Sequence, residues 1–247
     1  ARRLYDAGVD VSCVLVGDSS RLSPDCAHNY HLAADLHISI VNAVSTDSLP
    51  KSVQCDVIVD ALCGTGFTGL ARGVIADAIR LINNSEAVRI AVDLPSGINV
   101  DDGSCEGEAV SADVTCTLAL PKFGLFVSPG REHAGRVEVI PIGFPAHLID
   151  QCSSSCSLST AADIALMLPG RKADGHKFDF GTVLIVGGST GLTGAAALAG
   201  ESALRSGCGM ARIACPATTL PIIAPMIREA TTIPLPDIGK RGAFALR

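Results

Sequence analysis

Cys55-Asp56-Val57-Ile58-Val59-Asp60 decides the fold of this 247-residue chain, together with a second segment, Arg89-Ile90-Ala91-Val92-Asp93. The first continues into Ala61-Leu62-Cys63-Gly64-Thr65-Gly66-Phe67 and the second into Leu94-Pro95-Ser96-Gly97. Each is a short apolar strand that ends in a carboxylate beside a Gly or Pro turn. In an open parallel sheet, ligands bind in the crevice at the carboxyl ends of the strands. The sequence therefore predicts one site shared by Asp60 and Asp93.

The composition predicts a globular, cytoplasmic protein that acts on a small molecule. Hydrophobic residues make up 48% of the chain, enough for a packed core, and the formal net charge is −6. Lys and Arg form no dense cluster, and there are only two tyrosines and no tryptophan, which argues against a nucleic-acid partner. No segment is long and apolar enough to span a membrane.

Strands and helices alternate over the first part of the chain, which predicts βαβ units and a mainly parallel sheet with flanking helices. We expect strands at 11–16, 38–44, 55–60, 89–93 and 113–120, and helices at 23–36 and 74–83. The first helix has Ser23 as its N-cap and Pro24 at its first position. A strand at 135–140 follows with only a loop before it, so we expect an edge strand in a hairpin-like arrangement.

A Ser-rich segment, Gln151-Cys152-Ser153-Ser154-Ser155-Cys156-Ser157, has the composition of a linker. We therefore expect a first domain at 1–150, a linker at 151–160 and a second domain at 161–247. The spacing of Cys152 and Cys156 is not that of a zinc site, and no second pair completes four ligands. Most of the ten cysteines lie in apolar stretches and are expected to be free thiols.

The second domain is expected to be an incomplete α/β unit. Strands at 181–186 and 210–215 flank a Gly-rich loop at 187–191 and an Ala-rich helix at 194–206, which ends at Gly207. Two strands are too few for a stable sheet, so the chain is expected to be a fragment of a longer protein. The Gly-rich loop is read equally well as a phosphate cradle or as a simple strand-to-helix turn.

The run Gly64-Thr65-Gly66-Phe67-Thr68-Gly69 has the pattern G-x-G-x-x-G. One interpretation is the dinucleotide fingerprint of an NAD-dependent dehydrogenase, with Asp93 holding a ribose. The run follows a middle strand, however, and Gly73 delays the helix that should begin inside the motif. A loop whose backbone N–H groups approach a phosphate fits the glycines without that requirement.

Asp60 and Asp93 follow runs of Val, Ile and Ala, so each carboxylate is expected to be partly desolvated and to need a partner. A simple strand-end cap is the alternative interpretation. A cation held by Asp60, the Ser96 hydroxyl and backbone carbonyls would supply the partner for Asp60. The histidines at 28, 31, 133 and 147 have no spacing typical of a metal site or a catalytic triad.

Five blocks, in order and spacing, resemble NAD(P)H-hydrate epimerases over roughly residues 1–150. They are Val59-Asp60-Ala61-Leu62-Cys63-Gly64-Thr65-Gly66-Phe67, Val92-Asp93-Leu94-Pro95-Ser96-Gly97-Ile98, Ala112-Asp113-Val114-Thr115, Lys122-Phe123-Gly124 and Ile142-Gly143. The resemblance implies a Rossmann-like domain that interconverts the R and S epimers of hydrated NADH or NADPH, with a bound potassium ion.

The epimerase resemblance also implies roles for particular residues. Asp60 and Ser96 would be potassium ligands, and Asp93 would contact the hydrated dinucleotide. The loop contacts would be Gly64, Thr65, Gly66, Phe67, Thr68, Gly69 and Leu70. The family's Asn-Asn-Gly-Gly-Asp-Gly loop, which would add a potassium ligand and part of the pocket, has no counterpart here, so activity of this chain alone is in question.

A second set of blocks resembles the start of ADP- or ATP-dependent NAD(P)H-hydrate dehydratases, which have a ribokinase-like fold. They are Arg171, His176-Lys177-Phe178-Asp179-Phe180-Gly181, Val186-Gly187-Gly188-Ser189, Gly194-Ala195-Ala196 and Ala203-Leu204-Arg205-Ser206-Gly207-Cys208-Gly209-Met210. This resemblance implies that Ala195 contacts the substrate and that ADP or ATP binds mostly outside this chain. The two families in this order are the pattern of bifunctional nicotinamide-nucleotide repair enzymes.

Asp93 is our candidate acid/base for epimerisation, and Asp60 is the candidate that holds the cation. The hydrated dinucleotide is itself the substrate, so no redox cofactor is consumed. We expect no nucleic-acid or membrane partner, and leave open whether the protein is a homo-oligomer. The alternatives are the dehydrogenase already described and a non-catalytic binding protein.

Overall fold

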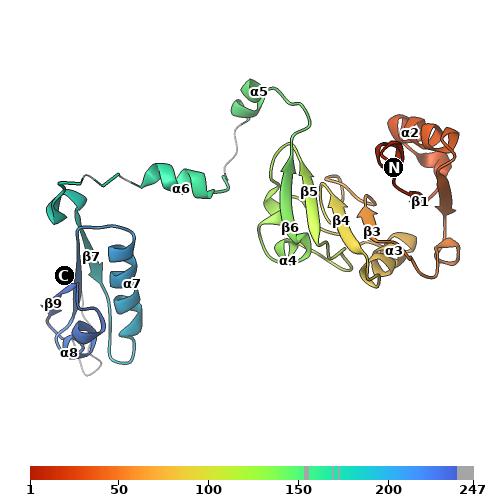
Figure 1. Ribbon diagram of the computed structural model, residues 1–247. Coiled ribbons are helices and arrows are strands. Elements are labelled where there is room, and N and C mark those ends of the chain that lie inside the picture. The colour runs from red at the N-terminus through yellow and green to blue at the C-terminus, as the bar shows by residue number, and fades with distance from the viewer. Residues whose placement is uncertain (153–155, 169, 172, 238–247) are drawn as a thin grey trace. The chain divides into compact units, whose positions relative to one another are not determined.

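The structure is a computed structural model that describes residues 1–152, 156–168, 170–171 and 173–237. The chain divides into two compact units, Ala1–Ser159 and Thr160–Arg247 (Figure 1). Residues 153–155 of the expected linker and 238–247 of the expected second domain lie outside the described residues. Within the described ranges, no helix combines the length and hydropathy needed to cross a bilayer.

The first unit is built on parallel strands, as the alternation of elements predicts. Its strands are β1 (Ser12–Val16), β2 (Ser39–Ala43), β3 (Val57–Asp60), β4 (Val88–Val92), β5 (Val114–Leu118) and β6 (Arg136–Ile140). They form a two-stranded sheet, β1-β2, and a four-stranded sheet in the order β3-β4-β5-β6, in which every described pair is parallel. The expected α/β class with parallel sheets is confirmed.

Helices lie before, between and after these strands. They are α1 (Arg2–Asp6), α2 (Pro24–Asp35), α3 (Val74–Asn83), α4 (Gly130–Ala134) and α5 (Ala146–Asp150), with short 3-10 turns η1 (Ser19–Arg21), η2 (Thr46–Ser48) and η3 (Phe123–Leu125). The Ser23 hydroxyl accepts a hydrogen bond from the Cys26 N–H, so the predicted N-cap of α2 is confirmed.

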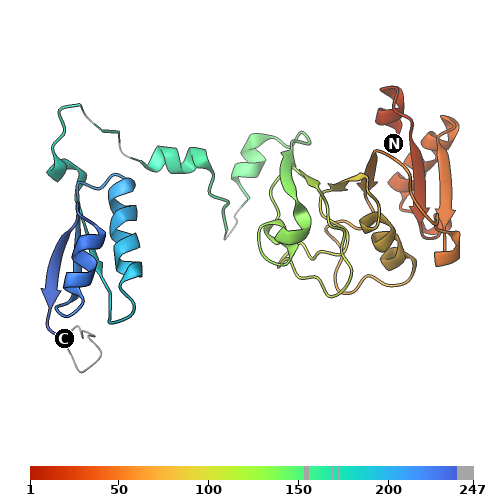
Figure 2. The same ribbon diagram turned by 60° about the horizontal axis from the view of Figure 1, so that its bottom comes forward.

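The register of the four-stranded sheet determines which side chains share a face. Asp60, Ala91, Thr115 and Val137 are successive partners across it, so they point to the same side. Val137 packs against a core that includes Ala134 of α4, and the core around α3 includes Ile58, which alternates onto the face of Asp60. Helices α3 and α4 therefore cover this one face of the sheet (Figure 2).

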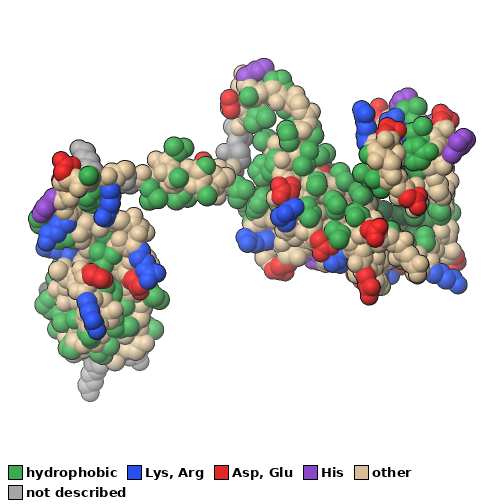
Figure 3. Space-filling model, viewed as in Figure 1, with side chains coloured by type: hydrophobic (Ala, Val, Ile, Leu, Met, Phe, Trp, Pro, Cys, Tyr) green, Lys and Arg blue, Asp and Glu red, His purple; other side chains and the backbone are tan. Residues whose placement is uncertain are grey.

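The other face of the sheet is apolar and partly exposed. Val57, Val59 and Val88 have exposed fractions of 46%, 46% and 48%. Hydrophobic side chains are accordingly visible at the surface of this unit between the charged ones (Figure 3). The buried core of the sheet therefore lies on the side that α3 and α4 cover.

The expected hairpin-like arrangement of the strand at 135–140 is wrong. β6 runs parallel to β5, with Val114 opposite Arg136 and Leu118 opposite Ile140. Parallel neighbours need a crossover connection, and the segment from η3 through α4 provides it. Because these helical turns are short, the sequence pattern does not reveal them. The expected edge position of the strand is confirmed.

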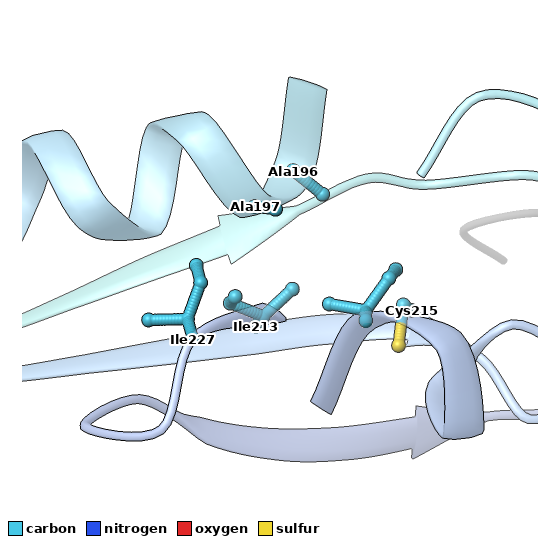
Figure 4. Packing of buried hydrophobic residues seen from close by; sticks show 6 residues of the cluster. Ala196, Ala197, Ile213, Cys215 and Ile227 are labelled. Carbon is cyan, nitrogen blue, oxygen red and sulfur yellow. The ribbon is translucent and has the colours of Figure 1, made fainter. Parts of the chain in front are cut away.

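The second unit holds a three-stranded parallel sheet in the order β7-β8-β9. Its elements are α6 (Ala161–Met167), η4 (Lys177–Phe180), β7 (Thr182–Val186), α7 (Gly194–Arg205), β8 (Met210–Pro216), α8 (Leu220–Ile223), η5 (Ala224–Met226) and β9 (Thr231–Leu235). Its core joins Ala196 and Ala197 of α7 to Ile213 and Cys215 of β8 and to Ile227 (Figure 4).

The expectation of only two strands in the second domain is wrong, because β9 adds a third. Its sequence, Thr231-Thr232-Ile233-Pro234-Leu235, carries a proline, which argues against a central strand. The position of β9 at the edge of the described sheet removes that objection, since an edge strand does not need every N–H group for pairing.

Ile79→Ala tests the α3 side of the first unit. Ile79 is fully buried, so the variant should lose about 2–5 kcal/mol of unfolding free energy through lost burial and a new cavity. Ile142→Ala is the matched control, because Ile142 is 52% exposed and its loss should cost about 0.5 kcal/mol or less. Urea unfolding followed by circular dichroism measures both, and equal losses would contradict this account of the core.

Candidate functional site

The carboxylate of Asp60, at the end of β3, is held by the turn after β4. Its Oδ2 accepts from the Ser96 N–H at 2.8 Å and its Oδ1 from the Ser96 hydroxyl at 2.6 Å. The Leu62 N–H adds a third donor to Oδ1 at 3.2 Å. Both Asp60 and Ser96 are 1% exposed. Burial raises the pKa of Asp60, and the hydrogen bonds offset this only in part.

Ser96 is itself fixed by the surrounding backbone. Its hydroxyl accepts from the Cys63 N–H at 2.9 Å, and its carbonyl accepts from the Val110 N–H at 2.9 Å. Gly97 follows with φ of 104°, and a Cβ there would lie 2.4 Å from the carbonyl oxygen of Glu108. Only glycine allows this close approach, so the turn that carries Ser96 is determined by packing.

Asp60 and Ser96 place two oxygen groups of the kind that bind hard cations next to each other. No Lys or Arg forms an ion pair with Asp60 among the described residues, so its buried negative charge has no cationic partner. The donor set is a carboxylate and a hydroxyl, both hard oxygen ligands. Across the same described ranges, no cluster of three or more His, Cys, Asp or Glu side chains is arranged to hold a metal ion.

Asp93 occupies a strained position at the end of β4. Its φ is 72°, and the Leu94 N–H donates to the Val92 carbonyl at 2.9 Å, which closes a γ-turn around it. A non-glycine residue in this region costs about 1–3 kcal/mol. The predicted strand 89–93 therefore ends one residue early, because Asp93 already belongs to the turn.

One carboxylate oxygen of Asp93 accepts all the hydrogen bonds that described residues donate to its side chain. Oδ1 accepts from the Leu118 N–H at 2.9 Å, from the Thr117 hydroxyl at 3.3 Å and from the Lys122 ammonium at 2.5 Å. Partial burial acts to raise the pKa of Asp93, but the Leu118 N–H and Lys122 outweigh it, so its pKa lies below the usual value. Asp93 is therefore ionised at neutral pH.

The loop at 64–70 presents backbone to solvent. Gly64, Thr65, Gly66 and Thr68 are exposed, and a Cβ on Gly64 or Gly66 would meet no atom within 4 Å. Phe67 donates its N–H to the Gly64 carbonyl at 3.0 Å and packs its ring near the α3 core. No other N–H of this loop has a partner in the part of the chain that the structure describes. Such groups can bind an anion.

The dinucleotide fingerprint is not formed by this loop. Helix α3 begins only at Val74, with Gly73 as its N-cap, so the helix N-terminus does not follow directly on the glycines. In the fingerprint, that N-terminus receives the pyrophosphate. The late start of α3 therefore weakens the dehydrogenase interpretation, as expected from the position of Gly73 in the sequence.

In the second unit, Ala195 lies exposed on the first turn of α7, just after the Gly-rich loop. Gly188 in that loop has φ of 88°, and a Cβ there would lie 2.7 Å from Cδ1 of Ile223. Packing alone therefore accounts for Gly188. The strand-to-helix turn is sufficient to explain this glycine, while Ala195 is placed where a ligand could reach it.

The structure brings the predicted residues into two neighbouring networks. Asp60 and Ser96 form one, and Asp93 belongs to the other, with the turn from 93 to 96 connecting them. Among the described residues, no hydrogen bond joins the two carboxylates directly. Sequence reasoning missed Lys122 as a site residue, although it quoted the block Lys122-Phe123-Gly124. Its place just after a strand that neighbours β4 was the available signal.

The fold and this site define an α/β protein with two carboxylates at the carboxyl ends of neighbouring strands of a parallel sheet. Residues 1–124 match the family described as YjeF-related protein N-terminus. The chain therefore belongs to the family of YjeF-related N-terminal proteins. Residues 183–241 match the family described as NAD(P)H-hydrate dehydratase, so the two resemblances expected from the sequence are confirmed in their order.

Individual relatives agree with these matches. The bifunctional NAD(P)H-hydrate repair enzyme Nnr of Moorella thermoacetica is 38% identical over 241 residues, which are 96% of this chain and 46% of that protein. The protein of the same name from Salinibacter ruber is 36% identical, with the same coverage. The NAD(P)H-hydrate epimerase of Levilactobacillus brevis is 40% identical over 146 residues, 59% of this chain and 66% of that protein. The chain thus spans about half the length of the bifunctional relatives.

Asp93→Asn should destabilise the first unit in a pH-dependent way. Because the folded state lowers the pKa of Asp93, its stabilisation is present above the unfolded-state pKa and is lost as the pH falls through the folded-state pKa. The variant should therefore have a lower urea midpoint than the parent at about pH 7, and the gap should narrow by about pH 3.5. Asp10→Asn, at an exposed position, is the control. A gap that is the same at both pH values would contradict this account.

Proposed function

We propose that this chain is part of a nicotinamide-nucleotide repair enzyme. Its first unit interconverts the R and S epimers of hydrated NADH and NADPH, and its second unit is part of an ADP- or ATP-dependent dehydratase that acts on the S form. The observation that carries the proposal is the buried Asp60–Ser96 pair beside a loop of free N–H groups, in a chain similar to a protein named NAD(P)H-hydrate epimerase.

In this proposal, Asp60 and Ser96 hold a potassium ion. The buried charge of Asp60 and the oxygen donor set support this assignment, and backbone carbonyls would complete the coordination. The ion would supply fixed positive charge that compensates the carboxylate of Asp60. The chain's own contribution is to keep the two ligand oxygens together at 2.6 Å.

The loop at 64–70 binds the phosphates of the hydrated dinucleotide. Its exposed N–H groups and the open space at Gly64 and Gly66 support this role, because a phosphate can approach the backbone closely there. In the second unit, Ala195 on α7 is the proposed contact for the dehydratase substrate, and its exposure supports that assignment. ADP or ATP binds mainly to residues beyond those in this chain.

Asp93 is the proposed acid/base. Inverting the carbon that carries the ring hydroxyl requires loss and return of water, or opening and closure of the ring. In either route a proton moves on and off the ring, and a carboxylate in the crevice can carry it. The ionised state of Asp93 at neutral pH makes it the proton acceptor in the resting site.

The alternatives are less well supported. An NAD-dependent dehydrogenase needs the helix N-terminus at its glycines, and α3 begins too late for that. A non-catalytic binding protein would keep the crevice without turnover. The proposal also includes a small-molecule substrate, no nucleic-acid or membrane partner and a cytoplasmic location; the last is supported by free thiols such as Cys63 and Cys215, which suit a reducing compartment.

The test is to supply one purified epimer of hydrated NADPH and to follow the appearance of the other by chromatography. Interconversion above the spontaneous rate is expected with potassium, and replacing potassium by choline should reduce it. Asp93→Asn should abolish the acceleration, and Asp60→Asn should remove the potassium dependence. If this chain does not accelerate the reaction, a chain extended to the length of the bifunctional relatives is assayed. An inert extended chain that still binds the hydrate would favour the binding protein.

Gly66→Ala separates the ligand role of the loop from a structural one. Because a Cβ on Gly66 meets open space, the unfolding free energy should change by about 0.5 kcal/mol or less. The added methyl should nevertheless obstruct a phosphate and raise KM by roughly tenfold, equivalent to about 1.4 kcal/mol. Gly170→Ala, also in open space but in the second unit, should change neither quantity. An unchanged KM for Gly66→Ala would remove the loop from the proposed site.

A further inference from the structure

Lys122 reaches the crevice through a second strained turn. β5 ends at Leu118, and Ala119 has φ of 64°, with the Leu120 N–H donating to the Leu118 carbonyl at 2.8 Å. This γ-turn at the end of β5 repeats the one around Asp93 at the end of β4. The chain then turns back at Pro121, and the Lys122 ammonium donates to the Leu118 carbonyl and to Asp93.

The contact between Lys122 and Asp93 is sheltered from water. Their side chains are 17% and 18% exposed, and the ammonium lies 2.5 Å from Oδ1 of Asp93. By comparison, Arg80 and Glu108 form an ion pair at the surface with exposed fractions of 52% and 47%. Because water screens the Lys122 pair less, it constrains the carboxylate more than a surface pair would.

The hydrogen bonds leave the two oxygens of Asp93 in different states. Oδ1 accepts from Leu118, Thr117 and Lys122, whereas Oδ2 accepts no hydrogen bond from any described residue. Because the two carboxylate oxygens are equivalent, a half-turn restores the same three contacts, whereas a smaller rotation weakens them. One oxygen, Oδ2 in this structure, therefore keeps its lone pairs free.

We propose that Lys122 is a positioning residue for epimerisation: by anchoring Oδ1 it leaves Oδ2 of Asp93 as the oxygen that accepts a proton or hydrogen bond from the hydrated nicotinamide ring. This inference rests on the proposed function, since it concerns how Asp93 acts there. Lys122 acts through Asp93 and does not transfer the proton itself. The Leu118 N–H and the Thr117 hydroxyl also donate to Oδ1 and lower the pKa of Asp93, but neither carries a formal charge.

We expect the loss of Lys122 to affect turnover more than ligand binding. Without the ammonium, the carboxylate can rotate and is more readily protonated, so the ligand should still bind while the chemical step slows. A misplaced acid/base group of this kind costs roughly 100-fold in rate. If Lys122 only held the end of β5 against η3, its replacement would lower the stability of the fold and leave the pKa of Asp93 unchanged.

The experiment combines two readings on the full chain. The first is the pH titration of the Asp93 carboxyl carbon by NMR of carbon-13-labelled protein, with Asp93→Asn to assign the signal. The second is kcat and KM for epimer interconversion. The variants are Lys122→Met and Lys122→Arg, with Lys51→Met as the control, because Lys51 is exposed and outside the crevice. If Lys122→Met does not fold, Lys122→Gln takes its place, since it keeps an N–H donor without the charge.

Support would be a raised pKa of Asp93 in Lys122→Met, a kcat lower by roughly 100-fold with KM changed little, and partial recovery of both in Lys122→Arg. An unchanged Asp93 titration would overturn the proposal, as would an unchanged kcat. The NMR titration does not need turnover, so it separates the two failures. If the Lys122 variants change the titration of Asp93 but neither this chain nor the extended chain catalyses epimerisation, the proposed function is overturned and the pairing of the two side chains remains.

Discussion

The hydrogen bonds between Asp60 and Ser96 are the constraint on which the crevice depends. Both residues are buried, and Asp60 takes the N–H and the hydroxyl of Ser96 at once, which ties the end of β3 to the turn after β4. That turn begins at Asp93 and ends at Gly97, whose close approach to the backbone of Glu108 admits no side chain. Breaking the pair would therefore release the position of Asp93 as well as that of Asp60.

The two carboxylates are placed by opposite electrostatic conditions. Burial raises the pKa of Asp60, and no described basic side chain compensates its charge, which supports the proposed cation there. The carboxylate of Asp93 forms an ion pair with Lys122, and this pair together with the Leu118 N–H lowers its pKa. The strain of the turn around Asp93 is offset by the donors that converge on Oδ1, because hydrogen bonds to charged groups contribute about 1.5–3 kcal/mol each. The charge of Asp60 thus has no described cationic partner, whereas that of Asp93 has one within the chain.

The sequence predicts what depends on local patterns. The amphipathic segment 74–83 coincides with α3, and both strand-end carboxylates lie where the apolar runs place them. What it did not predict depends on partners distant in the chain. Lys122 and Asp93 are separated by 29 residues, and only the pairing of β4 with β5 brings them together. The parallel direction of β6 and the acceptance of Pro234 in β9 likewise follow from sheet position, which no local pattern encodes.

The glycines show how structure separates roles that look alike in the sequence. Gly97 and Gly188 have positive φ, and a Cβ on either would collide with a neighbour, so folding alone explains them. Gly64 and Gly66 have neither constraint, since a side chain there would extend into open space beside unpaired N–H groups. A residue type that folding does not require is best explained by what must approach it. This contrast supports the proposed ligand contact at 64–66 in the first unit, whereas backbone conformation and packing are sufficient to explain Gly188 in the second.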